Sequence, residues 1–240
     1  MLGTGAVGSA LLRELPKASL RVVARWTRSS KKPLPNLASA EVVFLAVKDS
    51  AVEELCAELP VSRGQLVAHL AGALPLSALD AARQHGARIG SLHPLRAILS
   101  GDDFHGAAAG ISGKSASARE QLAALARRLG MTPLLIPDRS RALYHAAAVL
   151  SAGAQVALFS EAVRAFRLAT RSSEKEARAA LLPLTLGAIE KLRELPAAKA
   201  ITGPAARGDL RTIAANRAAL PADLLPLYDE LTRIALALRR

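Results

Sequence analysis

The sequence Gly3-Thr4-Gly5-Ala6-Val7-Gly8 decides the fold class of this chain. It matches the pattern G-x-G-x-x-G, in which the first glycine makes a tight turn, the second lets the backbone approach a pyrophosphate, and the third lets a helix pack on a strand. A helical pattern from Ala6 to Leu15 follows it, and then an apolar strand pattern from Leu20 to Ala24. This order predicts a dinucleotide site around Gly3, Gly5, Ala6, Val7 and Gly8.

A strand should precede this motif, but only Met1 and Leu2 do. In a doubly wound sheet that first strand is central, and without it two neighbouring strands would keep unpaired backbone groups. Either the coding frame begins about five residues upstream, the length of a typical strand, or the chain is a truncated relic. Because the rest of the motif is intact, we expect the upstream start.

As far as residue 137, short apolar runs alternate with helical patterns. Strands are predicted at Val42–Val47, Gln65–Leu70 and Arg88–Leu92, with weaker ones at Ala107–Ser112 and Thr132–Ile136. Helices are predicted between them, at Ser50–Glu58, Leu76–His85 and Ser117–Leu129. This alternation is typical of an α/β fold, so residues 1–137 are predicted to form a Rossmann-like, doubly wound parallel sheet without its first strand.

From Asp138 onward the strand patterns stop, and residues 138–240 are predicted to form an all-α domain. Ser140–Leu168 is one long apolar helical pattern. Ser173 is expected to cap a second helix, with Glu176 three residues later completing a capping box. A stretch rich in Pro and Gly, Pro196–Gly208, interrupts the helices, after which Asp209 caps a third helix and Pro221 begins the last.

Composition limits the class of protein. The 240 residues are 51% hydrophobic and 22% charged, which is enough to bury a core, and aromatic residues are only 3%, so that core is aliphatic. The net charge of +12 comes from scattered side chains without a basic stripe, so we expect no nucleic-acid partner. The single Cys56 excludes an intramolecular disulfide and multi-cysteine zinc sites, and we expect no metal. We see no transmembrane run or signal peptide, which predicts a cytoplasmic protein with no membrane partner.

The residues after the predicted second strand indicate which dinucleotide binds. NAD-binding folds place an acidic residue there for the ribose hydroxyls, but Arg25–Lys32 contains none. Arginine and small hydroxyl side chains suit a 2′-phosphate, so Thr27, Arg28 and Ser29 predict NADP; the alternative is a basic surface loop. Val47, Lys48 and Asp49 close the next strand and are expected to border the cofactor, although Asp49 could also be a simple helix N-cap.

Seven segments, in this order, resemble one known family: Gly3–Gly8, Thr27–Ser29, Ala46–Asp49, His69–Gly72, Ser91–Leu95, Tyr144–Ala148 and Thr202–Asp209. The chain resembles, over nearly its whole length, the bacterial Rossmann-like proteins with a C-terminal domain of unknown function 2520. That family is similar to pyrroline-carboxylate reductase, ketopantoate reductase and the 6-phosphogluconate dehydrogenase group. The resemblance implies an N-terminal NADP-binding domain and C-terminal helices through which two chains form a homodimer.

The chain departs from this family at three positions. Family members usually carry Ser where Ala71 stands, Asn where Gly153 stands and His where Asn216 stands. The hydroxyacid dehydrogenase relatives also use a Lys on the long interdomain helix, and Ala147–Gly153 contains none. An apolar helix cannot act as that acid or base, so oxidation of hydroxyacids is disfavoured, whereas carbonyl or imine reduction needs less of the protein.

Three residues are the candidates for chemistry. His93 follows a predicted strand and precedes Pro94, which holds it extended, and His145 opens the long helix beside Tyr144. Either histidine could donate a proton; packing of the two domains is the alternative for His145. Arg207, in a rigid Gly-Pro loop, could hold an anionic substrate or could pair with Asp209.

These residues predict an NADPH-dependent oxidoreductase acting on a small carbonyl or imine at the domain interface. The alternative is a non-catalytic, dimeric dinucleotide sensor or scaffold, which the replacements at Ala71, Gly153 and Asn216 favour.

Overall fold

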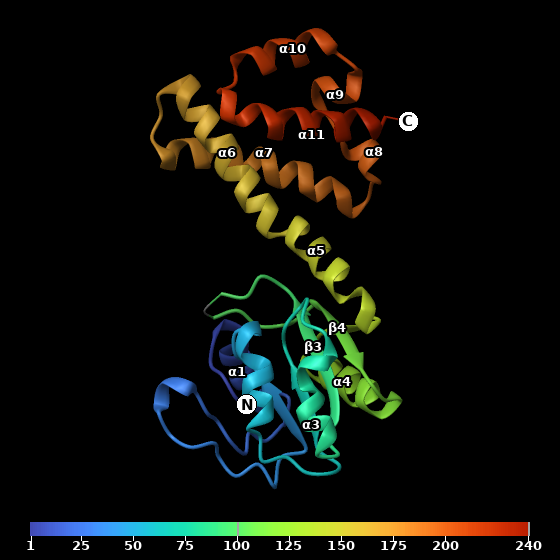
Figure 1. The fold of residues 1–240 in the computed structure, drawn as a ribbon. Helices are drawn as coiled ribbons and strands as arrows, with labels where there is room; N and C mark the ends of the chain where they lie inside the picture. Colours follow the sequence, from blue (N-terminus) through green and yellow to red (C-terminus); the bar gives the residue numbers. More distant parts are fainter. Residues whose placement is uncertain (100, 240) are drawn as a thin grey trace. The chain divides into compact units, whose positions relative to one another are not determined.

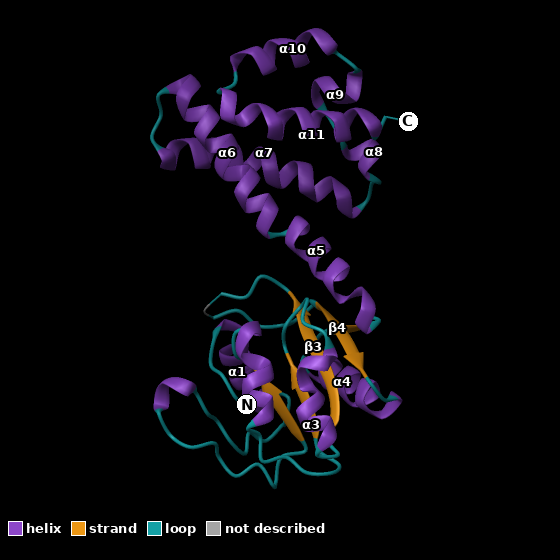
Figure 2. Cartoon of the chain, viewed as in Figure 1, coloured by secondary structure: helices purple, strands orange, loops and turns teal. Residues whose placement is uncertain are grey.

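The computed structural model describes residues 1–99 and 101–239 and divides the chain into two compact units, Met1–Ala152 and Gly153–Arg240 (Figure 1). The first unit holds every strand of the sheet, and the second is helical (Figure 2). The change from strands to helices was expected at residues 137 and 138. The first unit instead includes the following helix, α5 (Arg141–Ser151), because the side chain of Arg141 is buried within that unit.

A five-stranded sheet forms the centre of the first unit. Its strands lie in the order β1-β2-β3-β4-β5. They are β1 (Val42–Leu45), β2 (Leu66–His69), β3 (Arg88–Leu95), β4 (Ala108–Gly113) and β5 (Thr132–Leu135). β1, β2 and β3 are mutually parallel, β4 runs antiparallel to β3, and β5 is parallel to β4. The predicted α/β, Rossmann-like architecture with an all-α second part is confirmed, with one reversed strand.

Helices cover both faces of this sheet, as continuous apolar strands require. On one face, α1 (Ala6–Lys17) and α4 (Ala116–Arg128) pack Leu11 and Leu122 against a cluster that includes Phe44. On the other face, α2 (Val52–Ala57) and α3 (Asp80–Gln84) pack against Leu45, Val67 and Ile89. Cys56 is a buried thiol of this second cluster, and burial raises its pKa. The core is aliphatic, as the composition predicts.

The expected strand from Leu20 to Ala24 is not hydrogen-bonded as a strand. The chain there is irregular, and only Trp26 forms a bridge, to Leu2. Leu2 also bridges to Leu45, so Leu2 lies between β1 and the segment that ends at Trp26, where a central strand would run. The prediction is wrong at Leu20–Ala24, where the described residues offer no ladder of hydrogen bonds.

Besides two short 3₁₀ helices, η5 (Lys191–Arg193) and η6 (Ala222–Leu224), the second unit consists of six α-helices in the described part of the chain. They are α6 (Gly153–Thr170), α7 (Glu174–Glu190), α8 (Ala197–Ala200), α9 (Gly203–Arg207), α10 (Leu210–Ala219) and α11 (Leu225–Ala237). The two predicted caps are present: Ser173 and Glu176 form a capping box on α7, and the Asp209 side chain accepts from Thr212 N on α10. The stretch rich in Pro and Gly, expected to be irregular, contains the short helices α8 and α9.

The helical stretch Asp138–Thr170 is long and apolar enough, by length and composition, to cross a membrane. Its most apolar 18 residues have a mean hydropathy of 1.5, and 6% of them are buried. The expectation that no run is long and apolar enough for a transmembrane helix is therefore wrong by length and composition. The first part of the stretch is anchored in the globular first unit through Arg141, whose guanidinium donates to three protein groups. An exposed apolar helix fixed in this way also suits contact with another protein surface.

Candidate functional site

The glycine motif forms an open cradle between β1 and α1. Gly3 has φ +104°, and a Cβ there would overlap the carbonyl of Ala46; a Cβ on Gly8 would lie 2.6 Å from the Gly3 oxygen. These two glycines therefore permit close packing of the turn, strand and helix. A Cβ on Gly5 would meet nothing within 4 Å, so the turn presents bare backbone to an open space. Gly5 caps α1 without a side-chain bond, which leaves the first N–H groups of the helix free for an anion.

The basic turn predicted to receive a 2′-phosphate lies beside this cradle. Gly3 N donates to Trp26 O at 2.8 Å, and a 3₁₀ turn, η1 (Arg28–Ser30), follows directly. The Thr27 and Ser29 hydroxyls are 3.0 Å apart. The exposed Arg28 pairs with Glu54 at 3.1 Å, a contact worth little in water. The turn is thus hydroxyl-lined and accessible.

Val47, Lys48 and Asp49 border the cradle on its other side. Ala46 N donates to Leu2 O at 2.7 Å, which fixes the start of this segment next to the glycine turn. Asp49 begins a 3₁₀ turn, η2 (Asp49–Ala51), and in the described part of the chain its carboxylate makes no capping bond. The alternative interpretation of Asp49 as an N-cap is therefore not supported. All eleven predicted cofactor residues are gathered at the carboxyl edge of β1.

Three ring side chains meet at the same edge of the sheet. The rings of His93 and His145 contact edge to face, with centroids 5.5 Å apart, and the Tyr144 hydroxyl lies 3.0 Å from His93 Nδ1. Leu45, His69 and Ser91 pair across β1, β2 and β3, and His93 lies two residues further along β3. Tyr144 and His145 come from α5. Strand ends and one helix therefore place His93, Tyr144 and His145 together, as a cluster that we call the ring cluster.

A buried arginine anchors α5, the helix that carries two residues of the ring cluster. Arg141 is 1% exposed; its Nε donates to Leu74 O at 2.6 Å, its Nη1 to Ser112 Oγ at 2.9 Å, and its Nη2 to Ala71 O. Asp138, one turn earlier, accepts from Leu76 N at 2.9 Å. These bonds tie α5 to the segment after β2 and to β4 itself. Arg141 therefore fixes the helix that carries Tyr144 and His145.

Burial sets the protonation of this region. Burial, followed by the charge of His145, lowers the pKa of His93 to about 4, and burial with the charge of Arg141 lowers the pKa of His69 to about 3. Both rings are neutral at pH 7. Burial raises the pKa of the Tyr144 hydroxyl, which therefore keeps its proton. The His93–Tyr144 hydrogen bond can run in either direction, because the neutral imidazole carries its proton on Nδ1 or on Nε2.

The third predicted catalytic residue, Arg207, belongs to the other unit. It is exposed at the end of α9. Within residues 1–99 and 101–239 it forms no ion pair with Asp209, whose carboxylate caps α10 instead. The hydrogen bonds from Thr212 lower the pKa of Asp209, and the nearby charge of Arg207 adds to this effect, so the alternative role beside Asp209 stays open. The same described residues contain no group of three His, Cys, Asp or Glu side chains that could hold a metal ion.

The profile of the domain of unknown function DUF2520 matches residues 107–235, more than half of the chain. The chain belongs to this family. The DUF2520 match begins at β4 and runs through α11, so it includes the helix that carries Tyr144 and His145. No curated protein matches the chain.

Solved structures share the fold of this family member along its whole length. One is described as a candidate NADP oxidoreductase from Bacteroides fragilis (23% identity, 98% of this chain and 96% of that one, TM-score 0.77). Another is a protein from Thermotoga maritima (19%, 99% and 96%, TM-score 0.75). A third is the reductive aminase from Aspergillus terreus in complex with NADPH (18%, 100% and 93%, TM-score 0.71). At these identities the likeness establishes a common fold.

Sequence reasoning missed two members of this site. Arg141 reads as one more solvated arginine at a helix start, and Tyr144 was noted only as the neighbour of His145. A signal existed for both: Arg141, Tyr144 and His145 are three and four residues apart, which places them on one face of a helix. Nothing local showed that this face would be buried.

Proposed function

We propose that this DUF2520 protein is an NADPH-dependent oxidoreductase that reduces a small carbonyl or imine compound. The observation that carries the proposal is that the glycine cradle and the ring cluster share the carboxyl edge of the same parallel strands. In open α/β sheets this edge is where ligands bind. The solved reductive aminase holds NADPH, and the Plasmodium falciparum pyrroline carboxylate reductase, 12% identical with a TM-score of 0.62, has NADP bound; both support the proposal.

The residues of the cradle fit the cofactor. The open side of Gly5 and the free N–H groups of α1 suit the pyrophosphate, while Thr27, Arg28 and Ser29 suit the 2′-phosphate. Val47, Lys48 and Asp49 would border the sugar on the opposite side. When bound, NADPH supplies the hydride that reduces the substrate carbon.

Within this proposal Tyr144 takes the role of proton donor. Its hydroxyl is protonated at pH 7, since burial raises its pKa, and His93 3.0 Å away orients it by donating Nδ1–H to the phenol oxygen, which leaves the phenol proton for the substrate. His93 itself has a pKa of about 4 and carries no ionisable proton to give at pH 7. His145 contacts His93 and completes the wall of the cluster. We therefore assign the proton-donor role to Tyr144 instead of His93, and His93 becomes a positioning residue.

The test compares NADPH and NADH binding by calorimetry in the wild type and in Arg28→Ala. We expect the wild type to prefer NADPH, because NADH lacks the 2′-phosphate that the basic turn would receive. The Arg28→Ala variant should lose about tenfold in NADPH affinity, since a charged hydrogen bond is worth about 1.5 to 3 kcal/mol. Arg127→Ala removes an equal charge from the exposed face of α4 and serves as the matched control.

A panel of imines and keto acids then separates the two functions. NADPH oxidation with any member supports the reductase. Tight NADPH binding without turnover across the panel would favour the alternative, a dinucleotide sensor or scaffold. Equal affinity for NADH and NADPH would contradict the cofactor assignment itself.

A further inference from the structure

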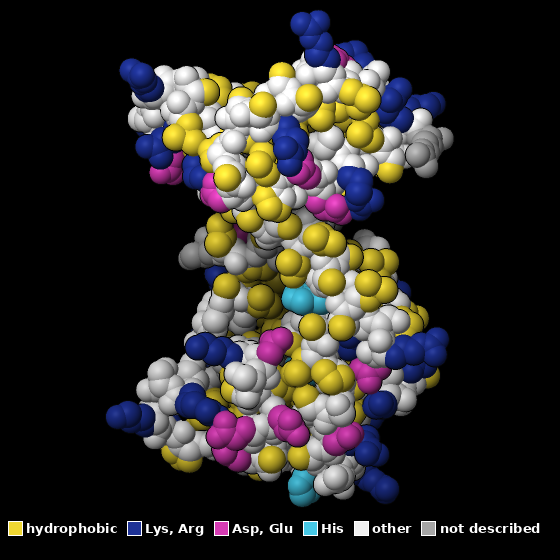
Figure 3. Space-filling view, turned by 45° about the horizontal axis from the view of Figure 1, so that its top comes forward, with side chains coloured by type: hydrophobic (Ala, Val, Ile, Leu, Met, Phe, Trp, Pro, Cys, Tyr) yellow, Lys and Arg dark blue, Asp and Glu magenta, His cyan; other side chains and the backbone are white. Residues whose placement is uncertain are grey.

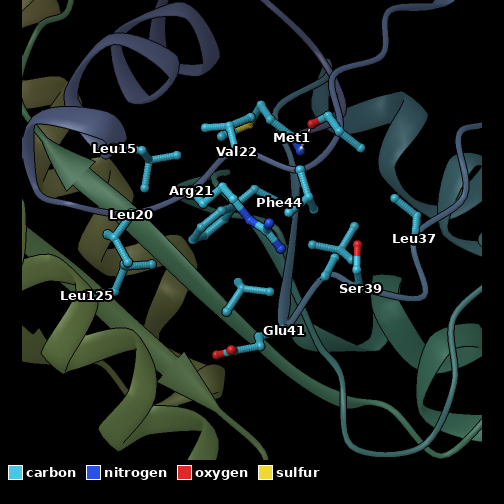
Figure 4. A pocket seen from close by; sticks show the side chains of 15 residues that line it. Met1, Leu15, Leu20, Arg21, Val22, Leu37, Ser39, Glu41, Phe44 and Leu125 are labelled. Carbon is cyan, nitrogen blue, oxygen red and sulfur yellow. Dashed lines mark hydrogen bonds between the residues drawn. The ribbon is translucent and has the colours of Figure 1, made fainter.

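A cavity of about 220 Å³ continues the line of Met1 and Leu2 through the sheet. One wall is the irregular segment Leu20–Ala24, and the other is β1 from Val42 to Phe44 (Figure 4). Leu15 and Leu125 line it from the helices of one face, and Leu37 lines it from the other side. We call this cavity the strand slot.

The backbone bonds at the mouth of the strand slot follow a parallel ladder. Leu2 bonds to β1: its N donates to Phe44 O at 2.8 Å, and its O accepts from Ala46 N at 2.7 Å. Met1 bonds to the opposite wall: its amino group donates to Ala24 O at 3.0 Å, and its O accepts from Trp26 N at 3.1 Å. Successive residues therefore bond to alternate walls, as residues of a central parallel strand do.

The same alternation continues into the slot on both walls. In β1, Glu41 and Leu45 direct their carbonyls to β2, accepting from Leu66 N and Leu70 N. The backbone of Val42 and Phe44 therefore faces the slot. By the same register, one residue before Met1 would reach Val42 O and Phe44 N, and the residue before that would reach Val22 O and Ala24 N. The slot is a template for a strand in a defined register.

The amino group of Met1 marks where such a strand would join. Met1 is 8% exposed, and burial together with Arg25 lowers the pKa of its amino group. An ammonium group is costly to bury, whereas a peptide N–H at the same place would donate the same bond to Ala24 O without a charge. The slot therefore suits a strand linked through the Met1 nitrogen better than a separate peptide.

The side chains around the slot specify the chemistry of that strand. Met1 belongs to the apolar cluster under α1 and α4, and Leu2 belongs to the cluster under α2 and α3. Alternate residues of the strand would enter these two clusters in turn, so apolar side chains are required on both faces. Arg21, Ser39 and Glu41 also line the slot, but all three are exposed, so a charge at the middle positions of the strand would be buried among apolar side chains.

We propose that the strand slot accepts one extended, wholly apolar segment of about four residues, parallel to both walls and bonded covalently to the nitrogen of Met1. The segment completes the ladder at Val22–Ala24 and Val42–Phe44. It also turns the irregular Leu20–Ala24 segment into a regular strand.

The test attaches Met-Val-Ile-Val-Ile ahead of Met1 and compares this protein with the unextended chain by hydrogen exchange and thermal unfolding. We expect the Ala24 and Phe44 amides to exchange about tenfold more slowly or better, because they gain ladder partners, and the midpoint temperature to rise. The matched control, Met-Val-Asp-Val-Ile, has the same length with one buried charge and should give neither effect. Neither readout depends on cofactor binding.

Two outcomes would overturn the proposal. In one, the apolar and Asp-containing extensions change exchange and unfolding equally. In the other, the free peptide acetyl-Val-Ile-Val-Ile-amide, added in excess, protects the Ala24 and Phe44 amides as fully as the covalent extension. The second result would show that the slot takes a separate peptide and that linkage through Met1 is not needed.

Discussion

At the residue scale, two glycines provide the space for the ring cluster. A Cβ on Gly110 would lie 2.6 Å from the Tyr144 hydroxyl, and a Cβ on Gly72 would overlap the His145 ring. Neither glycine has a positive φ, so the requirement comes from the neighbouring side chain and not from the turn. A sequence reading finds glycines that make turns, as it found Gly3. It cannot find glycines that make room for residues distant in the chain.

Tyr144 is the residue whose loss should affect chemistry most directly. With Tyr144→Phe we expect turnover of any reduced substrate to fall about 100-fold or more, the usual contribution of a positioned proton donor, with NADPH affinity unchanged. The second tyrosine, Tyr228, lies in the helical unit and gives the control Tyr228→Phe. Spectrophotometric titration provides a readout without substrate: the later-ionising phenol should disappear in Tyr144→Phe, because burial raises the pKa of that group.

The buried histidines predict how stability depends on pH. His93 and His69 have folded pKa values of about 4 and about 3, below the ordinary value of 6.5. The unfolded chain therefore takes up protons first, and the stability contributed by each neutral ring is lost as pH falls below 6.5. We expect urea unfolding to show a loss of up to about 3 kcal/mol for each ring between pH 6.5 and 4, since one pKa unit corresponds to about 1.4 kcal/mol. His93→Asn should flatten part of this slope, whereas the same change at the exposed His85 should not.

At the scale of elements, the start of α1 separates binding from folding. Gly5→Ala places a methyl group in open space, so the midpoint of thermal unfolding should stay within about 2 °C of wild type. The same methyl narrows the approach to the helix N-terminus, so NADPH affinity should fall about tenfold or more. Gly8→Ala meets the Gly3 oxygen at 2.6 Å and should lower the midpoint itself. Equal effects of both variants on stability would contradict this division.

The start of α7 is the element that the sequence predicted most completely. Ser173 Oγ accepts from Glu176 N, and the Glu176 carboxylate accepts from Ser173 N at 2.9 Å. Both partners lie within four residues, so the signature is local and can be read without the fold. Ser173→Ala should lower the free energy of unfolding by about 1 kcal/mol, measured in urea. Ser172→Ala, one residue earlier and outside the box, should change it by much less.

Leu20–Ala24 shows the opposite case. Its apolar pattern correctly marks a segment that lines the sheet, but a strand exists only where a partner strand offers hydrogen bonds. In the described residues the ladder hydrogen bonds involve Trp26 N and Ala24 O, both with Met1, and Leu20–Val23 form no such bonds. Local pattern therefore predicts which residues face the core, while pairing is decided by the neighbouring element.

At the scale of the whole molecule, alternating apolar runs and helical patterns sufficed to predict an α/β unit followed by helices. The direction of β4 was not predicted. A parallel connection needs a crossover of a dozen or more residues, usually with a helix, and the segment between β3 and β4 shows no helical pattern. The absence of a helical pattern between β3 and β4 therefore indicates, from the sequence alone, that β4 runs antiparallel to β3.

The helical unit carries apolar surface that predicts self-association. Leu182, Leu186 and Ile189 recur along α7 at helical spacing, and they are 46%, 55% and 46% exposed. Figure 3 shows hydrophobic side chains spread over the visible face of this unit. Monomeric proteins rarely leave such stripes open to water, and a second copy of the same chain can cover the stripe symmetrically. We therefore propose a homodimer through the C-terminal helices.

Sedimentation velocity at tens of micromolar protein tests this homodimer. We expect the wild type to sediment as a dimer and Leu186→Arg as a monomer, because the charge would be buried without a partner in the middle of the stripe. Leu210→Arg introduces the same charge at a 66% exposed leucine of α10, outside the α7 stripe, and should leave the dimer intact. Circular dichroism must show equal helix content in all three proteins. A monomeric wild type, or a dimer that survives Leu186→Arg, would exclude α7 as the interface.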